Sequence, residues 1–229
     1  MSIARYDLHL HTEFSPDCDT ALDAIEKHAL AQGLTGLAVT DHDAIEGALR
    51  LRDRVKTLHV IVGEEVTTTD GDVIGLFLRE RIPPKMSALD TMQAIHAQGG
   101  IVYLPHPFDK PRARRTGGAS LVAVLPEVDI IETFNGKVGR DRYNLFAHDF
   151  ARKHDKVSGG GSDAHHLRAI GTVFNEFESP ADPDDPAQFL HALASAHITG
   201  KRRSKLGGWL VRGRRPLSLA WRRLRYGKP

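Results

Sequence analysis

The stretch Asp7-Leu8-His9-Leu10-His11-Thr12 places two histidines at the end of a predicted short strand, residues 5–10. In an extended chain, side chains two residues apart lie on the same face of the strand. The imidazoles of His9 and His11 can therefore reach one common point, such as a metal ion. A single His-x-His pair is usually just two histidines on a strand, so its meaning depends on the rest of the chain.

The rest of the chain alternates between strand-like and helix-like segments. Apolar runs predict strands, and apolar residues at helical spacing predict helices. Strands are expected at residues 34–39, 58–66, 73–78, 101–104, 128–131, 156–159 and 172–177, and helices at 21–32, 45–55, 88–97, 140–154 and 186–196. This alternation is typical of a mainly parallel sheet, which forms either a barrel or an open doubly wound sheet.

Residue types that bind metals follow most of these strands. In chain order they are His9, His11 and Asp17, Asp41 and His42, Glu64 and Glu65, His106, Glu132 and Asn135, and Asp163 and His165. In barrel enzymes the active site is built at the carboxyl ends of the strands, so side chains from six strand ends would meet in one cavity. Mixed imidazole and carboxylate ligands suit Zn, Mn or Fe.

Each motif also has an interpretation without metal. Asp41-His42 fits a turn, Glu64-Glu65 fits a solvated pair, and His106 between two prolines fits a rigid turn. These alternatives weaken together, because the same residue types recur at the same end of consecutive strands. We therefore expect a metal site in which a carboxylate such as Glu65 bridges two ions. Two such ions can hold the attacking and leaving oxygens of phosphoryl transfer, and one can supply hydroxide at neutral pH.

These ordered motifs resemble those of the polymerase and histidinol phosphatase (PHP) superfamily. The resemblance rests on residues 7–12, Ser15, Thr40-Asp41-His42-Asp43, Gly63-Glu64-Glu65, Pro105-His106-Pro107 and Gly161-Ser162-Asp163-Ala164-His165. It implies an α/β fold, a distorted (βα)7 TIM-like barrel, and metal-dependent hydrolysis of phosphate esters. It also implies a ligand set of His9, His11, Glu65, His106 and Asp163, with Asp17, His42 and His165 completing a second metal.

Two departures from the family pattern concern a third metal ion. The family often has one histidine where Asp72 stands and another near Glu132 or Asn135, and this chain has neither. The resemblance thus implies two or three divalent ions of Mn, Zn or Fe, with the third dependent on these positions. Glu132 is expected to be a weak ligand or to support a ligand from behind.

Three side chains are expected to act on the substrate. His42 or His165 can pass a proton to the leaving group. Arg114, in the basic segment 110–115 that follows His106, can grip phosphate oxygens with its planar guanidinium. A solvated basic loop is the alternative interpretation of this segment, and Lys137 is a weaker candidate for the same role.

Charge divides the 229 residues into two parts. We expect a barrel domain at residues 1–200 and a basic, partly amphipathic tail at residues 201–229, which holds 11 Lys and Arg and no acidic residue. Because the net charge is +2, residues 1–200 carry a balance of −9. Such a tail fits binding to nucleic acid, binding to an anionic membrane, or packing on the acidic body.

A cytoplasmic location is expected from three features of the sequence. The first residues hold no apolar run typical of a signal peptide. No apolar stretch approaches the roughly 18 residues that a membrane-spanning helix needs. The single cysteine, Cys18, excludes an internal disulfide and suits a reducing compartment.

The sequence therefore favours a phosphatase or phosphodiesterase that uses a metal-activated water. A nucleotide or another small phosphorylated substrate is expected, with an oligonucleotide as a further option. Two alternatives stay open: an amidohydrolase-like C–N hydrolase, and a non-catalytic metal-containing module that binds its partner through the tail. The motifs at residues 40–43 and 63–65 argue against the first, and the full ligand set argues against the second.

Overall fold

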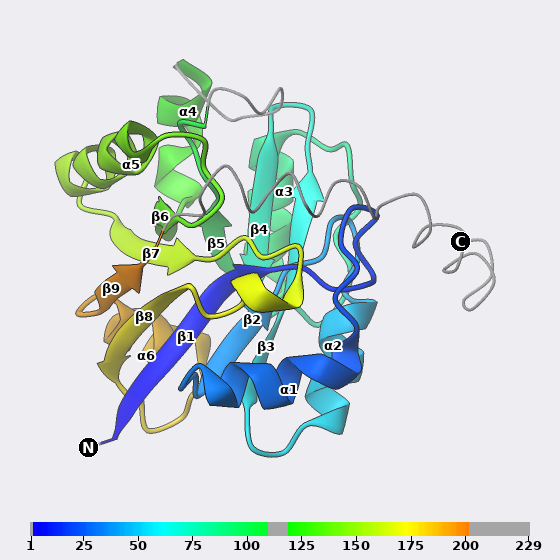
Figure 1. Ribbon diagram of the computed structural model, residues 1–229. Helices are drawn as coiled ribbons and strands as arrows, with labels where there is room; N and C mark the ends of the chain where they lie inside the picture. Colours follow the sequence, from blue (N-terminus) through cyan, green and yellow to red (C-terminus); the bar gives the residue numbers. More distant parts are fainter. Residues whose placement is uncertain (1, 110–118, 202–229) are drawn as a thin grey trace.

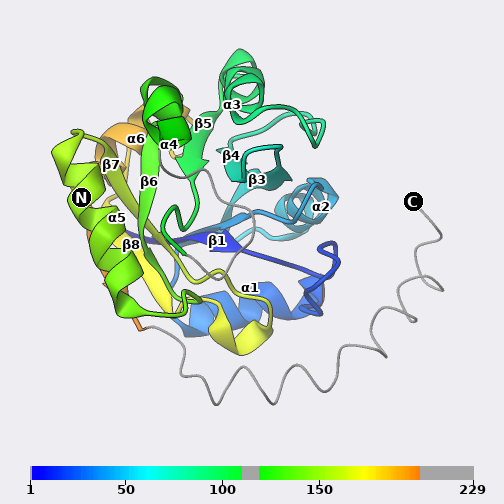
Figure 2. The same ribbon diagram turned by 90° about the horizontal axis from the view of Figure 1, so that it is seen from above.

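A computed structural model describes residues 2–109 and 119–201 of the chain (Figure 1). These residues form a single nine-stranded sheet of order β7-β6-β5-β4-β3-β2-β1-β8-β9. Its strands are β1 (Ile3–Leu10), β2 (Gly36–Val39), β3 (His59–Thr67), β4 (Asp72–Leu76), β5 (Ile101–Leu104), β6 (Ile130–Asn135), β7 (Val157–Gly161), β8 (Val173–Glu178) and β9 (His197–Gly200). The helices are α1 (Leu22–Ala31), α2 (Glu46–Arg54), α3 (Ala88–Ala97), α4 (Ala119–Val124), α5 (Asp141–Lys153) and α6 (Pro186–Leu193), and they lie around the strands (Figure 2).

The sheet is less parallel than the sequence analysis predicts. The pairs β1–β2, β2–β3, β5–β6 and β6–β7 are parallel, whereas β3–β4, β4–β5, β1–β8 and β8–β9 are antiparallel. The link between β3 and β4 is a hairpin that pairs Thr67 with Asp72, and it is too short for the crossover helix that parallel strands require. Because β4 reverses the chain and β5 reverses it again, β1, β2, β3, β5, β6 and β7 all run in the same direction.

Most predicted elements form, with shifted ends. Helix α3 begins where predicted because Ser87 caps it, with its hydroxyl oxygen accepting a hydrogen bond from Asp90 N at 3.1 Å. Helix α4 and strand β9 are not predicted from the sequence, and β9 is a four-residue edge strand that is too short for a clear apolar pattern. Among the described residues, no helix is both long and apolar enough to cross a bilayer.

Strand β7, at one end of the sheet, approaches β1 and β8 near the other end, which makes the sheet a nearly closed barrel. Just after β7, Asp163 N donates to His9 O at 2.7 Å, and His11 N donates to Ala164 O at 2.9 Å. The side chain of Asn175 on β8 also bridges the strands, since it accepts from Gly160 N at 2.8 Å and donates to Tyr6 O at 2.9 Å. The prediction of an α/β, distorted barrel-like fold is confirmed, although the sheet has nine strands rather than seven.

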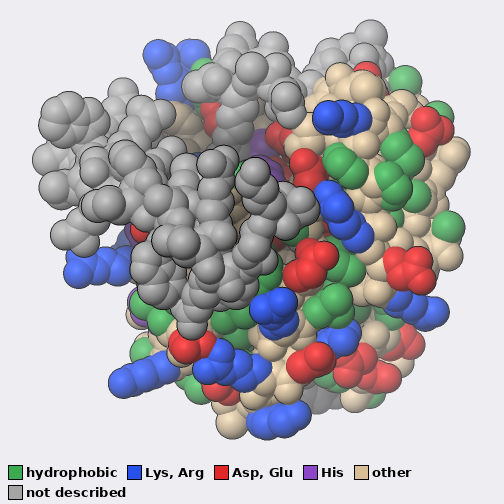
Figure 3. Space-filling model, turned by 90° about the vertical axis from the view of Figure 1, so that its right-hand side faces the viewer, with side chains coloured by type: hydrophobic (Ala, Val, Ile, Leu, Met, Phe, Trp, Pro, Cys, Tyr) green, Lys and Arg blue, Asp and Glu red, His purple; other side chains and the backbone are tan. Residues whose placement is uncertain are grey.

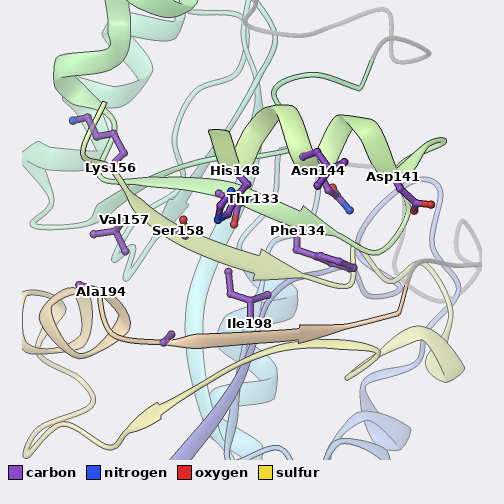
Figure 4. A pocket seen from close by; sticks show the side chains of 12 residues that line it. Thr133, Phe134, Asp141, Asn144, His148, Lys156, Val157, Ser158, Ala194 and Ile198 are labelled. Carbon is purple, nitrogen blue, oxygen red and sulfur yellow. The ribbon is translucent and has the colours of Figure 1, made fainter. Parts of the chain in front are cut away.

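A cavity of about 640 Å³ marks the place where β7 and β9 do not pair (Figure 4). Residues of α5, β6, β7 and β9 line it, among them Asn144, His148, Ser158 and Ile198. None of the predicted metal ligands lies in its wall. This cavity is therefore separate from the site described below.

A β-bulge in β1 turns the two histidines toward the barrel interior. Tyr6 and Leu8 pack in the interior cluster, so simple alternation would place His9 and His11 on the outer face. Between Asp7 and Leu10, however, three steps along β1 correspond to only two steps along β2, and Leu10 joins the outer core under the helices. The bulge thus reverses the alternation just before the histidines.

Strand β6 contains a second bulge of the same kind. Its register against β7 shifts between Glu132 and Phe134. As a result both Glu132 and Asn135 are buried, and Asn135 Nδ2 donates to Glu132 Oε2 at 2.9 Å, although they are three residues apart. The two bulges lie at the ends of strands that carry predicted functional residues, which is a common place for them.

Candidate metal centre

The carboxyl ends of the codirectional strands bring the eight predicted metal ligands together. These residues are His9, His11, Asp17, His42, Glu65, His106, Asp163 and His165, each within 4 Å of at least one other. Most of them are buried, while 26% of the His42 side chain and 37% of the Asp17 side chain are exposed. Figure 3 shows histidine side chains in a recess of the surface, with acidic side chains beside them.

Four donor atoms form the first group. His9 Nε2 and His11 Nε2 are 3.2 Å apart, and they lie 3.4 and 3.3 Å from Glu65 Oε2. Asp163 Oδ1 is 3.8 and 3.5 Å from the same two nitrogens. Ligand atoms held about 2.1 Å from one tetrahedral ion are about 3.4 Å apart. The spacing of this group therefore suits one metal ion.

Glu65 lies between this group and two others. Its Oε1 is 3.1 Å from His106 Nε2, and its Oε2 is 3.3 Å from His42 Nδ1. His9, Glu65 and His106 form a set of three possible ligands whose donor atoms all lie within 4.8 Å of one another. A carboxylate in this position can contribute one oxygen to each of two neighbouring ions.

The remaining predicted ligands gather around His11. Donor atoms of His11, His42 and His165 lie within 4.8 Å of one another. Asp17 joins them, with Oδ2 2.9 Å from His165 Nε2 and Oδ1 3.8 Å from His42 Nε2. Asp17 Oδ1 is buried without a hydrogen-bond partner among the described residues. A buried carboxylate oxygen that receives no hydrogen bond is available to bind a cation.

The orientation of the histidine rings also fits a cation. His9 Nδ1 is 2.9 Å from Glu132 Oε1, and His11 Nδ1 is 3.0 Å from Ser15 Oγ. With their Nδ1 atoms engaged in this way, the two Nε2 atoms turn their lone pairs toward the same point. Such outer partners commonly fix the tautomer of a metal-bound imidazole.

Buried charges adjust the ionisation of these groups. Burial lowers the pKa of His9, but the carboxylates of Glu132, Asp163 and Glu65 outweigh it and raise this pKa well above its ordinary value. Burial opposes ionisation of Glu65, yet His42 and His9 hold its pKa well below the usual range. Burial and the neighbouring His165 lower the pKa of His11. The site thus attracts a positive charge and keeps the Glu65 carboxylate ionised.

Two predicted ligands have strained backbones. His106 has φ 30° and Asp163 has φ 50°, both in the left-handed region that favours glycine. Hydrogen bonds hold each of them there, from His106 N to Glu132 Oε2 at 2.7 Å and from Asp163 N to His9 O at 2.7 Å. Backbone strain of this kind is concentrated at functional sites.

Two residues outside the set of eight predicted ligands support the loops of the centre. Asp41 accepts hydrogen bonds from Thr12 N at 2.6 Å and from Thr12 Oγ1 at 2.7 Å, which fixes the loop after β1. Asp7 accepts from Ser162 N and Gly171 N, both at 2.9 Å, and so ties β1 to the loop that carries Asp163. For Asp7, the signal available in the sequence was a charged residue inside an apolar strand segment.

Other residues singled out in the sequence fall outside the centre. Glu64 points away from Glu65 and accepts a hydrogen bond from Ile82 N at 2.8 Å. Glu132 and Asn135 contact the predicted ligands rather than completing a separate group. Arg112, Arg114 and Arg115, together with the tail from residue 202, lie outside the described residues.

Known proteins match most of the chain. Residues 7–124 match the PHP domain family, and residues 141–198 match the PHP-associated family. An uncharacterized protein of Methanocaldococcus jannaschii is 31% identical over 196 residues, which cover 82% of this chain and 78% of that protein.

Two solved structures have a similar fold. One is a two-domain protein from Bacteroides vulgatus containing a predicted PHP-like metal-dependent phosphoesterase, with a TM-score of 0.71 and 18% identity over 87% of this chain and 65% of that one. The other is Endonuclease Q in complex with a 27-mer duplex substrate, with a TM-score of 0.64 and 16% identity over 86% of this chain and 58% of that one. The chain thus spans less than two thirds of either structure. At these identities the likeness concerns the fold alone, whereas the family matches and the relative establish that the chain belongs to the PHP domain family.

Proposed function

We propose that this protein is a metal-dependent phosphoesterase with a multinuclear centre. Membership of the PHP family and the His, Asp and Glu clusters support a metal-dependent hydrolase. The observation that supports the multinuclear centre is the position of Glu65, whose Oε2 lies 3.3 Å from both His11 Nε2 and His42 Nδ1 while its Oε1 lies 3.1 Å from His106 Nε2. His9, His11, Glu65 and Asp163 would hold one ion.

The other predicted ligands would hold the second ion, with His106 extending the centre on the far side of Glu65. Asp17, His42 and His165 form this second set. When bound, divalent ions of Mn, Zn or Fe lower the pKa of a coordinated water and neutralise charge on the phosphoryl oxygens. The protein's own groups orient the substrate and handle the proton of the leaving oxygen. We assign this proton transfer to whichever of His42 and His165 does not bind the second ion, since both lie beside the partly exposed Asp17.

A small phosphate ester is the proposed substrate, with a nucleotide as the first choice. Acidic side chains lie beside the histidines in the recess of Figure 3. Because these carboxylates repel an anion, an anionic substrate would depend on the metal ions for its binding. Endonuclease Q, whose structure has a related fold, is described with a duplex substrate, which supports testing oligonucleotides as well. Arg114 stays a proposed phosphate-binding residue.

Residues 1–200 are proposed as the catalytic unit and residues 201–229 as a partner-binding tail. The family matches end at residue 198, which supports this division. Strand β9 runs parallel to β1, because each is antiparallel to β8, so its last residue Gly200 lies toward the end of the barrel that carries the centre. We propose that the tail binds a polyanion such as nucleic acid, and an anionic membrane is the alternative outcome.

A substrate panel tests the proposed activity. The Mn-loaded protein is given an aryl phosphate, an aryl phosphodiester, nucleotides, a single-stranded oligonucleotide, an anilide and a lactone. We expect turnover of at least one phosphoester that disappears when a chelator removes the metal. Turnover confined to the anilide or lactone would instead identify a C–N or lactone hydrolase. A protein that binds metal but turns over none of these compounds would favour the binding-module alternative.

A further inference from the structure

Lys137 reaches the metal centre from the turn that follows β6. Its Nζ lies 3.2 Å from Asp163 Oδ1 and 2.9 Å from His165 Nε2. About a third of the side chain, 29%, is exposed. The lysine side chain therefore lies between the buried ligands and solvent.

The turn that carries Lys137 is fixed by hydrogen bonds. Lys137 N donates to Asn135 Oδ1 at 2.8 Å, and Gly136 N donates to Gly161 O on β7 at 3.0 Å. The side chain of Asn135 in turn donates to Glu132 Oε2 at 2.9 Å and to Asp163 Oδ2 at 3.1 Å. The base of the lysine side chain is thus held by the same groups that hold the centre.

Gly136 allows this turn to lie close to the loop after β7 and to the start of β8. A Cβ at this position would come within 3.0 Å of Ser162 O and 3.1 Å of Val173 Cγ2. Both contacts are tighter than ordinary van der Waals distances, so a side chain here would push the turn outward. The close approach brings Lys137 within reach of Asp163 and His165.

The present partners of Lys137 are also predicted metal ligands. A lone pair of Asp163 or His165 that coordinates a metal ion cannot at the same time accept a hydrogen bond from an ammonium group. In the metal-bound centre Lys137 would lose part of this pairing, while its four-carbon stem lets the charge turn toward the recess. A buried or half-buried cation at that place needs an anion as its partner.

We propose that Lys137 binds a non-bridging oxygen of an anionic phosphoryl group. The inference rests on the proposed phosphoesterase function and deepens it, since it assigns the charge of the substrate. A lysine in this position favours phosphate esters, which carry a negative charge next to the scissile bond, over neutral amides and lactones. The competing interpretation is that Lys137 serves only as a counter-ion that keeps Asp163 in place.

Binding of inorganic phosphate separates the two interpretations. Full-length protein is loaded with Mn, its metal content is measured, and phosphate binding is followed by calorimetry. The variants are Lys137→Met, which removes the charge at similar length, and Lys137→Arg, which keeps it. Lys153→Met is the matched control, because Lys153 is exposed at the end of α5.

We expect Lys137→Met to weaken phosphate binding by about tenfold or more, as for the loss of one charged hydrogen bond. Its Mn content should equal that of the wild type, Lys137→Arg should retain most of the affinity, and Lys153→Met should behave as wild type. Unchanged phosphate binding in Lys137→Met, no phosphate binding by the wild type, or a loss of Mn from Lys137→Met would each overturn the proposal.

Hydrolysis by the wild type is measured separately on the aryl phosphate and the aryl phosphodiester. If the wild type hydrolyses either ester while Lys137→Met binds phosphate normally, only the role of Lys137 is wrong. If Lys137 proves necessary for phosphate binding but no phosphoester is hydrolysed, the proposed function fails and the anion site stands.

Discussion

Glu132 supports two predicted metal ligands from behind. One of its oxygens contacts His9 Nδ1 at 2.9 Å, and the other accepts from His106 N at 2.7 Å. The side chain is completely buried, so both contacts occur away from water. We infer that Glu132 orients His9 and holds the strained backbone of His106.

The variant Glu132→Gln tests this role. The amide nitrogen replaces one of two acceptor oxygens, so either His9 or the His106 backbone loses its partner. We expect metal affinity to fall by about 10- to 100-fold, as for other groups that orient a ligand. Metal titration measures this change, with Glu176→Gln on the surface pair with Arg5 as the control. Equal affinities for Glu132→Gln and the wild type would show that Glu132 does not orient the ligands.

Cys18 gives a second prediction for a single residue. Burial raises the pKa of its thiol to about 12, and Sγ lies 3.2 Å from His11 O. Since the thiolate is the reactive form, we expect no alkylation of the folded protein by iodoacetamide at pH 8 and complete alkylation in urea. Mass spectrometry after timed labelling measures the difference. Rapid labelling without denaturant would mean that the loop after β1 opens in solution.

The residues of the centre differ in how far the sequence could predict them. His9 and His11, or Asp163 and His165, are recognisable because a two-residue spacing places ligands on one face of an extended chain. The supporting contacts of Asp7, Glu132 and Lys137 depend on groups more than 25 residues away in the chain. No local pattern encodes such contacts, so only the folded structure reveals them.

Gly161, at the end of β7, allows this strand to pack closely against β1. A Cβ at this position would overlap the Cβ of His9 and would lie 2.9 Å from both His9 N and Glu132 Oε1. Because two of these atoms belong to the backbone or Cβ of β1, the strands would have to separate. The glycine therefore determines how closely β7 can approach the histidine pair.

Gly161→Ala should destabilise both the fold and the centre. We expect the free energy of unfolding to fall by about 1–3 kcal/mol, the usual effect of overpacking, together with weaker metal binding. Urea denaturation and metal titration measure the two effects, and Thr199→Ala on the exposed face of β9 is the control. A variant that binds metal and unfolds like the wild type would contradict the close approach of β1 and β7.

The positions of the strands and helices could be predicted from the sequence, but the directions of several strands could not. It placed most strands and helices within a few residues, because their apolar patterns are local. It expected a mainly parallel sheet because strands and helices alternate, but β4 follows β3 through a hairpin, and β8 and β9 add two antiparallel pairs. The bulges in β1 and β6 were also unpredictable, since they depend on register against a neighbouring strand.

At the scale of the whole molecule, charge is divided unevenly between the last 29 residues and the rest of the chain. The tail holds 11 Lys and Arg among residues 201–229, and the rest of the chain carries an excess of acidic residues. Lys201 N donates to Thr172 O at 2.9 Å, which anchors the beginning of the tail beside β8. The tail therefore begins beside the barrel.

Deletion of residues 202–229 tests the proposed role of the tail. We expect the truncated protein to hydrolyse a small aryl phosphoester like the full chain, but to lose its salt-dependent binding to single-stranded oligonucleotide. Fluorescence anisotropy at two salt concentrations measures the binding. Undiminished oligonucleotide binding would contradict this role, and binding of the full chain to anionic vesicles alone would indicate a membrane instead.

The central claim is that the gathered His, Asp and Glu side chains form a catalytic metal centre. The most direct test measures bound metal per chain and hydrolysis of an aryl phosphodiester and an aryl phosphate on the same preparations of wild type and His9→Ala. We predict at least two divalent ions per wild-type chain and metal-dependent hydrolysis, with fewer ions and lost activity in His9→Ala. A wild type that binds no metal and hydrolyses neither ester, even after Mn, Zn or Fe is supplied, would contradict the account.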